Sequence, residues 1–223
     1  MRDEQIAALA KQIDAISLGH PLRVAIDGRT ASGKTTLANE LADILRSAGR
    51  NVIRTSIDGF HRPKAERYAK GRYSAEGYYR DARDLEAITN LLLVPLGADG
   101  DRCYRTACFD LEKDEPMNAE PALADPSSIL IVDGTFLQRP ELSPHWDFVV
   151  FVEVSVDLAA NRGIARDSLT AGGGSEATML YRERYQPAFR MYEDECDPVQ
   201  LADVIFKNEE LERPELVNRR KVE

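Results

Sequence analysis

Residues 28–35 read GRTASGKT, a full match to the pattern G-x-x-x-x-G-K-S/T. A mostly apolar run from Leu22 to Asp27 precedes the motif, and apolar residues at helical spacing follow it from Lys34. The glycines let such a loop curl until several backbone N–H groups point inward, and the helix behind it places the positive end of its dipole beneath a bound anion. The order of strand, loop and helix therefore predicts a phosphate-binding P-loop at the edge of a sheet.

The P-loop also predicts roles for its side chains. Lys34 is expected to carry its charge to the outer phosphates of a nucleoside triphosphate, and the Thr35 hydroxyl is expected to bind Mg²⁺. The segment ILIVDG at 129–134 has the form of a Walker B strand, so Asp133 is the second expected magnesium ligand. We expect ATP as the nucleotide, with GTP left open, and Mg²⁺ as the cofactor. The residues expected to bind the nucleotide are Gly28, Arg29, Thr30, Ala31, Ser32, Gly33, Lys34, Thr35 and Thr36.

Apolar periodicity along the rest of the chain predicts an α/β fold. Helices are expected at about 3–17, 34–48 and 85–92, and strands at 22–27, 51–57, 129–132, 147–154 and 204–206. Continuous apolar strands that alternate with helices indicate a parallel sheet covered on both faces. We expect a doubly wound sheet in one P-loop kinase-like domain over 1–223, with an acceptor loop at about 60–80 and a mobile lid at about 160–175. The tail RRKVE is expected to be solvated.

Composition narrows the classes of function. The formal net charge of −9 argues against nucleic acid as the main partner, because binding to a phosphate backbone requires a positive field. The N-terminal residues lack the apolar core of a signal peptide, and the apolar runs are far shorter than a membrane span. We therefore expect a cytoplasmic protein without a membrane partner, and leave its oligomeric state open. Cys103, Cys108 and Cys196 are expected to be buried thiols, with a metal site as the alternative.

Asp58, in the stretch TSIDGF, ends the strand that follows the P-loop helix. The carboxyl ends of parallel strands share one edge of a sheet, so Asp58 is expected to face the same crevice as Lys34. A carboxylate there can accept the proton of an attacking hydroxyl, which favours a kinase. The alternatives for Asp58 are a turn residue or a second Mg²⁺ ligand. The GTPase tetrapeptide N-K-x-D does not occur in the sequence, and a regulatory ATPase without a small acceptor remains the other class.

An ordered set of motifs extends over nearly the whole chain: GRTASGKT, IDGFHRP, ILIVDG, NRGIARD, YQPAF and ADVIF. This set resembles the phosphoribulokinase/uridine kinase family of P-loop kinases. The resemblance implies transfer of the γ-phosphoryl group of ATP to a hydroxyl of a small, nucleoside-like acceptor, with Asp58 as the base. It also matches Arg162 and Arg166 to arginines of the family's lid. Because they are four residues apart, both point from one helical face, where they join Lys34 as expected catalytic cations; a solvated helix face is the alternative.

The acceptor site departs from the uridine kinase pattern. Tyr78, in GYYRDARD, stands where similar kinases carry an acid that holds the ribose hydroxyls, and Phe109 stands near the position of a histidine associated with the pyrimidine. The stretch TAGGGS also stands where the family often has a further arginine. The resemblance thus implies a nucleoside-like acceptor first. An anionic or sugar acceptor, of the ribulose 5-phosphate, pantothenate, glycerate or fructose type, is the alternative.

The segment from His61 to Arg80 differs from the rest of the chain in charge. It holds six Lys or Arg against two Glu, and four of the eight tyrosines. Tyrosine faces stack on a flat base or a sugar, and arginines bind carboxylate or phosphate in bidentate fashion. We expect this loop to receive the acceptor; the alternative is a solvated loop paired with the acidic surface. The expected acceptor contacts are Asp58, Phe60, His61, Arg62, Tyr78, Tyr79 and Arg80, with Arg62 and Arg80 the favoured arginines.

Overall fold

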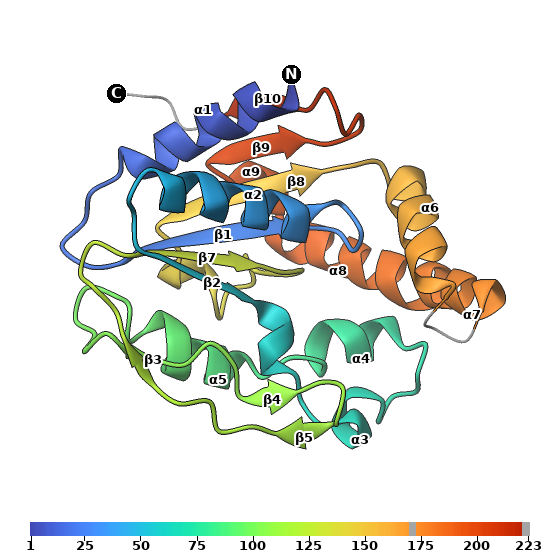
Figure 1. Ribbon diagram of the computed structural model, residues 1–223. Coiled ribbons are helices and arrows are strands. Elements are labelled where there is room, and N and C mark those ends of the chain that lie inside the picture. Colours follow the sequence, from blue (N-terminus) through green and yellow to red (C-terminus); the bar gives the residue numbers. More distant parts are fainter. Residues whose placement is uncertain (170–172, 220–223) are drawn as a thin grey trace.

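The computed structural model describes residues 1–169 and 173–219, and its centre is a six-stranded sheet (Figure 1). The strand order is β10-β9-β8-β1-β7-β2, and every neighbouring pair is parallel except β9 and β10. This arrangement confirms the expected α/β fold. The six strands are β1 (Leu22–Gly28), β2 (Val52–Ser56), β7 (Ile129–Asp133), β8 (Phe148–Glu153), β9 (Val204–Lys207) and β10 (Glu215–Asn218).

Helices cover both faces of the sheet, and α6 and α7 lie beyond the carboxyl ends of its strands (Figure 1). Three segments, α7, η4 and α8, follow one another without a break, and η4 is a π-helix. In chain order, the helices of the described residues are α1 (Arg2–Asp14), α2 (Lys34–Ser47), η1 (Ile57–Phe60), α3 (Lys64–Arg67), α4 (Ala75–Arg80), α5 (Leu85–Ile88), η2 (Thr89–Leu93), η3 (Ser143–His145), α6 (Val156–Asp167), α7 (Gly174–Met179), η4 (Leu180–Tyr185), α8 (Gln186–Cys196) and α9 (Pro198–Leu201).

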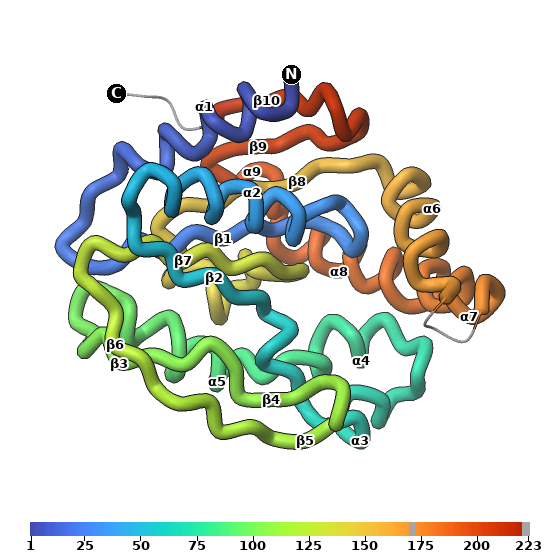
Figure 2. Tube along the Cα trace, in the orientation of Figure 1, coloured from blue at the N-terminus to red at the C-terminus, as the bar shows by residue number. Residues whose placement is uncertain are grey.

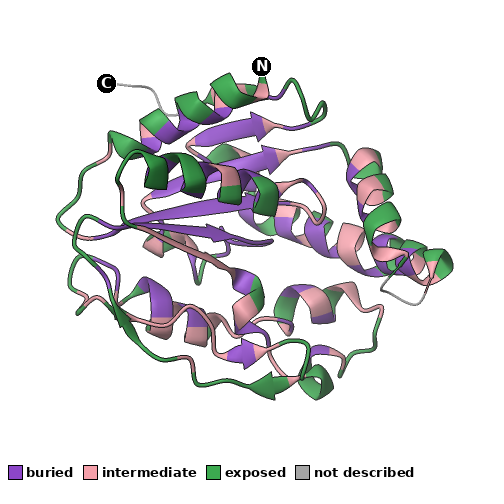
Figure 3. Ribbon diagram, viewed as in Figure 1, coloured by how far each residue is buried: buried purple, intermediate pink, exposed green. Residues whose placement is uncertain are grey.

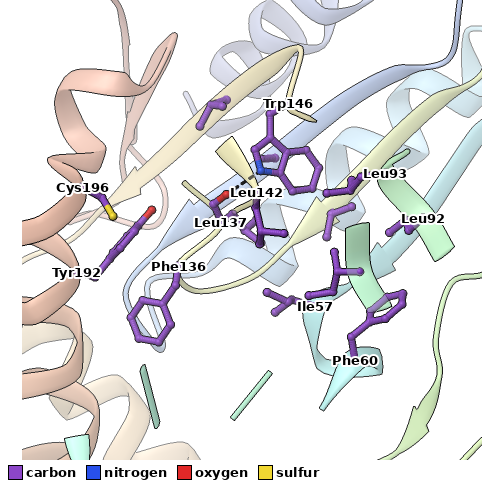
Figure 4. Close-up of a cluster of buried hydrophobic side chains, with 14 of the residues drawn as sticks. Ile57, Phe60, Leu92, Leu93, Phe136, Leu137, Leu142, Trp146, Tyr192 and Cys196 are labelled. Atoms are coloured by element: carbon purple, nitrogen blue, oxygen red, sulfur yellow. Dashed lines mark hydrogen bonds between the residues drawn. The ribbon is translucent and has the colours of Figure 1, made fainter. Parts of the chain in front are cut away.

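Two cores lie on opposite faces of the sheet because successive side chains of a strand point to opposite sides. Val24 and Ile26 of β1 belong to the core that α1 and α2 cover, whereas Ala25 belongs to the other. Strands β1, β7, β8 and β9 are almost completely buried (Figure 3). The second core includes Phe60 and Phe136, and Trp146 donates a hydrogen bond there from Nε1 to the carbonyl of Leu137 at 2.7 Å (Figure 4).

The chain between β2 and β7 forms a separate irregular layer, seen at the bottom of Figure 2. It contains two short antiparallel pairs, β3 (Cys103–Tyr104) with β6 (Ala122–Leu123) and β4 (Phe109–Asp110) with β5 (Glu115–Pro116). Neither pair was expected. Cys103 is exposed and Cys108 is partly buried, so the expectation of a buried thiol holds for Cys196 and is wrong for the other two.

Residues 170–172 of the expected lid and residues 220–223 of the tail lie outside the described part of the chain. Within the described part, no helix combines the length and the apolar character that crossing a bilayer requires.

Candidate active site

The P-loop joins β1 to α2, and its path requires glycine at two positions. Gly28 has φ = 145° and Gly33 has φ = 98°, values that favour glycine. A Cβ on Gly28 would lie 2.5 Å from the carbonyl oxygen of Val152, and one on Gly33 would lie 2.5 Å from Nδ2 of Asn208. Asn208 in turn donates a hydrogen bond to the carbonyl of Ser32 at 2.8 Å. The ends of β8 and β9 therefore hold the loop in a tight curl.

Helix α8 supports the P-loop from the other side. Asp27 is fully buried at the end of β1, where it accepts hydrogen bonds from the backbone N–H of Gly28 at 2.7 Å and from the Tyr192 hydroxyl at 2.5 Å. Arg29 forms an ion pair with Glu193 at 2.8 Å and lies over the ring of Phe189. The side chain of Arg29 thus faces α8, so only its backbone remains for phosphate.

A cavity of about 440 Å³ opens where β1, β2 and β7 end. The P-loop, the start of α2, the segment after β2, and residues of α6 and η4 line it. Six Lys or Arg and three Asp face this cavity, so its walls are positive although the chain is acidic. The expected nucleotide-binding residues that line it are Thr30, Ala31, Gly33, Lys34, Thr35 and Thr36.

Lys34 lies at the floor of the cavity and is only 8% exposed. Its Nζ donates a hydrogen bond to the carbonyl of Arg29 at 2.7 Å. Burial lowers the pKa of Lys34 to about 8, and the nearby carboxylates of Asp27, Asp133 and Asp58 oppose that shift only in part. The ammonium therefore lacks full compensation, and a phosphate at this position would supply it.

Two oxygen ligands of the kind that Mg²⁺ prefers meet beside the P-loop. The Thr35 hydroxyl donates a hydrogen bond to Oδ2 of Asp133 at 2.5 Å, as expected for a P-loop threonine next to a Walker B aspartate. The other oxygen of Asp133, Oδ1, lies 2.6 Å from Nη2 of Arg54 on β2. Thr35 and Asp133 fit a magnesium site that phosphate oxygens and water would complete, and Arg54 competes there for one carboxylate oxygen.

Asp58 stands at the opposite wall, in η1, within a hydrogen-bonded group that includes His61 and Arg83. Arg83 donates from Nη2 to Oδ1 of Asp58 at 2.7 Å, and its Nη1 lies 2.6 Å from Nε2 of His61. Nδ1 of His61 lies 2.9 Å from the carbonyl oxygen of Asp58. Since arginine can only donate, Nε2 of His61 must accept, and Nδ1 must carry the proton. This assignment requires a neutral imidazole.

The electrostatics agree with that assignment. Burial and, after it, the positive charge of Arg83 together lower the pKa of His61 to about 4, so the ring is neutral at pH 7. Partial desolvation opposes ionisation of Asp58, but the positive charges of Arg83 and Lys34 help to hold its pKa below the usual value. The Asp58 side chain remains 61% exposed. Asp58 is thus an ionised, accessible carboxylate on the same cavity as Lys34.

Arg162 and Arg166 of α6 both line the cavity. Arg162 donates to the carbonyls of Asn208 at 2.9 Å and Glu209 at 2.8 Å. Arg166 pairs with Asp167 at 2.6 Å, and this hydrogen bond raises its pKa. The two arginines share a helical face toward the cavity, while other protein groups hold their guanidinium groups.

The expected acceptor residues divide into two groups. Asp58, His61 and Tyr78 line the cavity, whereas Phe60, Arg62, Tyr79 and Arg80 do not. Phe60 is fully buried in the core, and the hydroxyl of the buried Tyr79 donates to Glu195 at 2.9 Å.

Arg80 also pairs with Glu195 and lies over the ring of Tyr79, 4.7 Å from its centroid. Arg62 is partly exposed, and its Nη1 lies 4.0 Å from a carboxylate oxygen of Glu66. The rotation of α4 explains why Tyr79 and Arg80 point away from the cavity that Tyr78 lines, because neighbouring helical residues point in directions about 100° apart.

Other residues occupy the acceptor side instead: Arg67, Tyr68, Arg83, Arg184 and Tyr185. Arg67 and Tyr68 belong to the basic, tyrosine-rich segment from His61 to Arg80. The sequence indicated that this segment is charged and aromatic, but not which of its side chains point into the cavity. Arg83 lies next to Asp84, an expected helix cap, which it precedes by one position. Arg184 and Tyr185 come from η4, more than 100 residues away, and the adjacent motif YQPAF was the available signal for them.

The model of the phosphoribulokinase / uridine kinase family matches residues 24–212 of this chain. The chain belongs to that family. It is 27% identical over 176 residues to uridine-cytidine kinase B of Dictyostelium discoideum, covering 78% of this chain and 70% of the relative. It is 23% identical over 186 residues to a uridine kinase of Halobacterium salinarum, covering 82% and 78%. Both relatives are uridine kinases by name, and their identities of 27% and 23% to this chain support the family and not a particular acceptor.

Solved structures show the same fold. A possible uridine kinase from Bacillus stearothermophilus superposes with a TM-score of 0.70 at 28% identity, over 91% of this chain and 97% of that one. D-glycerate 3-kinase from Cryptococcus neoformans superposes with a TM-score of 0.55 at 12% identity, over 96% and 97%. The second likeness concerns the fold alone. Membership in this family and the P-loop identify the protein as a kinase-family phosphotransferase.

Proposed function

We propose that this protein transfers the γ-phosphoryl group of ATP to a hydroxyl of a small metabolite, with Mg²⁺ as its cofactor. One observation carries the proposal: an ionised, 61% exposed carboxylate, Asp58, lines the same cavity as the desolvated P-loop lysine, Lys34. Family membership supports the same reaction. The names of the relatives favour a nucleoside-like acceptor, and the rings of Tyr68, Tyr78 and Tyr185 offer faces for a flat base or a sugar.

The reaction needs a base, a phosphate clamp and a positive wall. Asp58 takes the proton of the acceptor hydroxyl as the hydroxyl oxygen forms a bond to the γ-phosphorus. The bond between the γ-phosphorus and the β–γ bridging oxygen breaks, and that oxygen leaves with the electron pair on ADP. Lys34 and the P-loop N–H groups hold the phosphates, while Arg162 and Arg166 face the transferring group from α6.

Thr35 and Asp133 would hold Mg²⁺, which neutralises charge on the β- and γ-phosphates when it is bound. Arg83 has a different task, because it touches the base rather than the phosphates. Its guanidinium pairs with Oδ1 of Asp58 and leaves Oδ2 as the oxygen available to a hydroxyl. His61 fixes the second nitrogen of the Arg83 fork, so the carboxylate is held in one orientation.

The test is ADP release with Mg²⁺-ATP over a panel of acceptors: uridine, cytidine, nicotinamide riboside, ribulose 5-phosphate, pantothenate, glycerate and fructose. Asp58→Asn should retain ATP binding and lose about 10²- to 10⁴-fold in kcat, because it removes a general base. Asp110→Asn is the matched control, since Asp110 lies outside the cavity lining. Wild-type turnover in Asp58→Asn would remove Asp58 as the base. ADP release that no acceptor stimulates would favour a regulatory ATPase.

A further inference from the structure

Arg184, on η4, is a buried cation without a carboxylate partner in the described part of the chain. It is 4% exposed, and its Nη1 donates to the backbone carbonyl of Arg72 at 2.7 Å. No Asp or Glu of residues 1–169 or 173–219 lies within ion-pair distance of it. Burial lowers the pKa of Arg184, the direction expected for a buried cation that lacks a carboxylate partner. Such a cation costs free energy that a bound anion would return.

Two tyrosine rings hold the guanidinium group of Arg184 in place. The rings of Tyr68 and Tyr78 each lie 4.9 Å from it by their centroids, and all three residues line the cavity. Tyr68 and Tyr78 belong to the acceptor loop expected at 60–80. Arg184 therefore faces the acceptor side of the cavity, whereas the P-loop and α6 form the side that holds nucleotide phosphates. A stacked arginine is preorganised to bind phosphate or carboxylate because little rotamer entropy is lost on binding.

The other two arginines of the acceptor side are already neutralised. Arg67 pairs with Asp114 at 2.7 Å, and Arg83 pairs with Asp58 at 2.7 Å. Each nevertheless keeps a buried Nε–H that has no hydrogen-bond acceptor among the described residues. Against three arginines there are two carboxylates, so the acceptor side holds one uncompensated positive charge, and that charge is Arg184. A neutral nucleoside would leave it unpaired.

We infer that the acceptor carries an anionic oxygen group, a phosphate or a carboxylate, which Arg184 binds while the acceptor hydroxyl faces Asp58. Arg67 and Arg83 line the same wall and add to the positive field. The inference deepens the proposed kinase function and rests on it for the reaction. The anion site itself rests on the contacts of Arg184 alone.

Matched acceptors that differ in one charged group test the inference with the wild-type protein. The pairs are ribulose and ribulose 5-phosphate, pantothenol and pantothenate, and glycerol and glycerate, with uridine and cytidine as neutral nucleosides. We expect kcat/KM for the anionic member of the productive pair to exceed that of its neutral partner by about 100-fold. The ribulose pair reports a phosphate, and the other two report a carboxylate. Equal turnover of both members, or a preference for uridine or cytidine, would overturn the inference.

Binding of small anions tests the site without catalysis. Inorganic phosphate and acetate are titrated by calorimetry into protein saturated with Mg²⁺ and a non-hydrolysable ATP analogue, so that the P-loop is already filled. We expect one anion to bind and Arg184→Gln to weaken it by about tenfold or more, the effect of one charge-assisted hydrogen bond. Arg182→Gln is the control, because Arg182 is 68% exposed on the same helix and pairs with Glu183. Arg184→Lys, which keeps the charge, should retain part of the affinity.

The two experiments separate the two proposals. Anion binding that depends on Arg184, without transfer to any acceptor, would refute the kinase proposal and leave the anion site standing. Transfer to neutral acceptors, with no anion bound by the wild-type protein, would support the kinase proposal and refute the anion site. The wild-type measurements need no variant, so a folding defect in Arg184→Gln leaves both results decisive.

Discussion

Replacing Lys34 by methionine should stabilise the nucleotide-free protein while abolishing its affinity for ATP. Burial lowers the pKa of Lys34 from 10.5 to about 8. At about 1.36 kcal/mol per pH unit, this difference corresponds to about 3.4 kcal/mol of destabilisation at pH 7, where lysine is protonated in both the folded and the unfolded state. Methionine also removes the hydrogen bond to the Arg29 carbonyl, which contributes about 1 kcal/mol. The net gain in the free energy of unfolding is therefore about 2 kcal/mol.

The sign of the pH dependence follows from the same pKa. Between about pH 8 and pH 10.5 the folded protein has released the Lys34 proton while the unfolded chain still holds it, so the wild-type protein becomes more stable relative to the variant as the pH rises. By pH 9.5 the charge penalty falls by about 2 kcal/mol, and the advantage of methionine disappears.

Urea denaturation at pH 7 and pH 9.5 measures both effects, with and without Mg²⁺-ATP. Lys113→Met is the control, because Lys113 is 73% exposed and its replacement should change stability by less than about 0.5 kcal/mol. Mg²⁺-ATP should stabilise the wild-type protein and not Lys34→Met. A Lys34→Met protein that is less stable than wild type at pH 7 would refute the reasoning that the empty site carries an uncompensated charge.

Three further outcomes are expected. Gly28→Ala should lower the free energy of unfolding by about 2–3 kcal/mol, because the φ of 145° at Gly28 and the nearby carbonyl of Val152 both exclude a Cβ. Thermal denaturation measures the loss of stability, and an unchanged melting temperature would contradict the prediction. Because the pKa of His61 is low in the folded protein, the unfolded chain binds a proton at a higher pH than the folded protein does. The free energy of unfolding should therefore fall as the pH drops from 6.5 to 4, and it should fall less in His61→Gln. Urea titrations at pH 5 and pH 7 measure this, and an equal loss in both proteins would contradict the prediction. Arg54→Gln should raise the affinity of the ATP-loaded protein for Mg²⁺ by about threefold or more, because the substitution removes the ion pair between Arg54 and Oδ1 of Asp133. A weaker affinity for Mg²⁺ in calorimetry would show instead that Arg54 orients the Asp133 carboxylate for the metal.

The sequence predicted the central sheet well because the signal for it is local. Runs such as ILIV before Asp133 are apolar over their whole length, and that pattern alone indicates a strand buried on both faces. The edge strand β10 and the short pairs β3–β6 and β4–β5 lack such a pattern, since their residues are largely exposed. Their existence depends on neighbours that come from elsewhere in the chain.

The site was predictable where chemistry and position coincide. Lys34, Thr35 and Asp133 lie in motifs whose residue types have one geometric role, and Asp58 follows from the shared edge of parallel strands. The direction of Tyr78 and Tyr79 was not predictable, because it depends on how α4 is rotated against the core. Arg184 came from a distant helix, and no spacing along the sequence links it to the loop that it contacts.

The continuous helical run of α7, η4 and α8 contacts both the acceptor side of the cavity and the base of the P-loop. Arg184, near the middle of this run, lines the acceptor side of the cavity. About two turns further on, Tyr192 donates a hydrogen bond to Asp27, and Glu193 pairs with Arg29 at the start of the P-loop. Because α7, η4 and α8 are continuous, we expect a displacement of Arg184 to move Tyr192 and Glu193 with it. An anion bound at Arg184 and a nucleotide bound at the P-loop should then change each other's affinity.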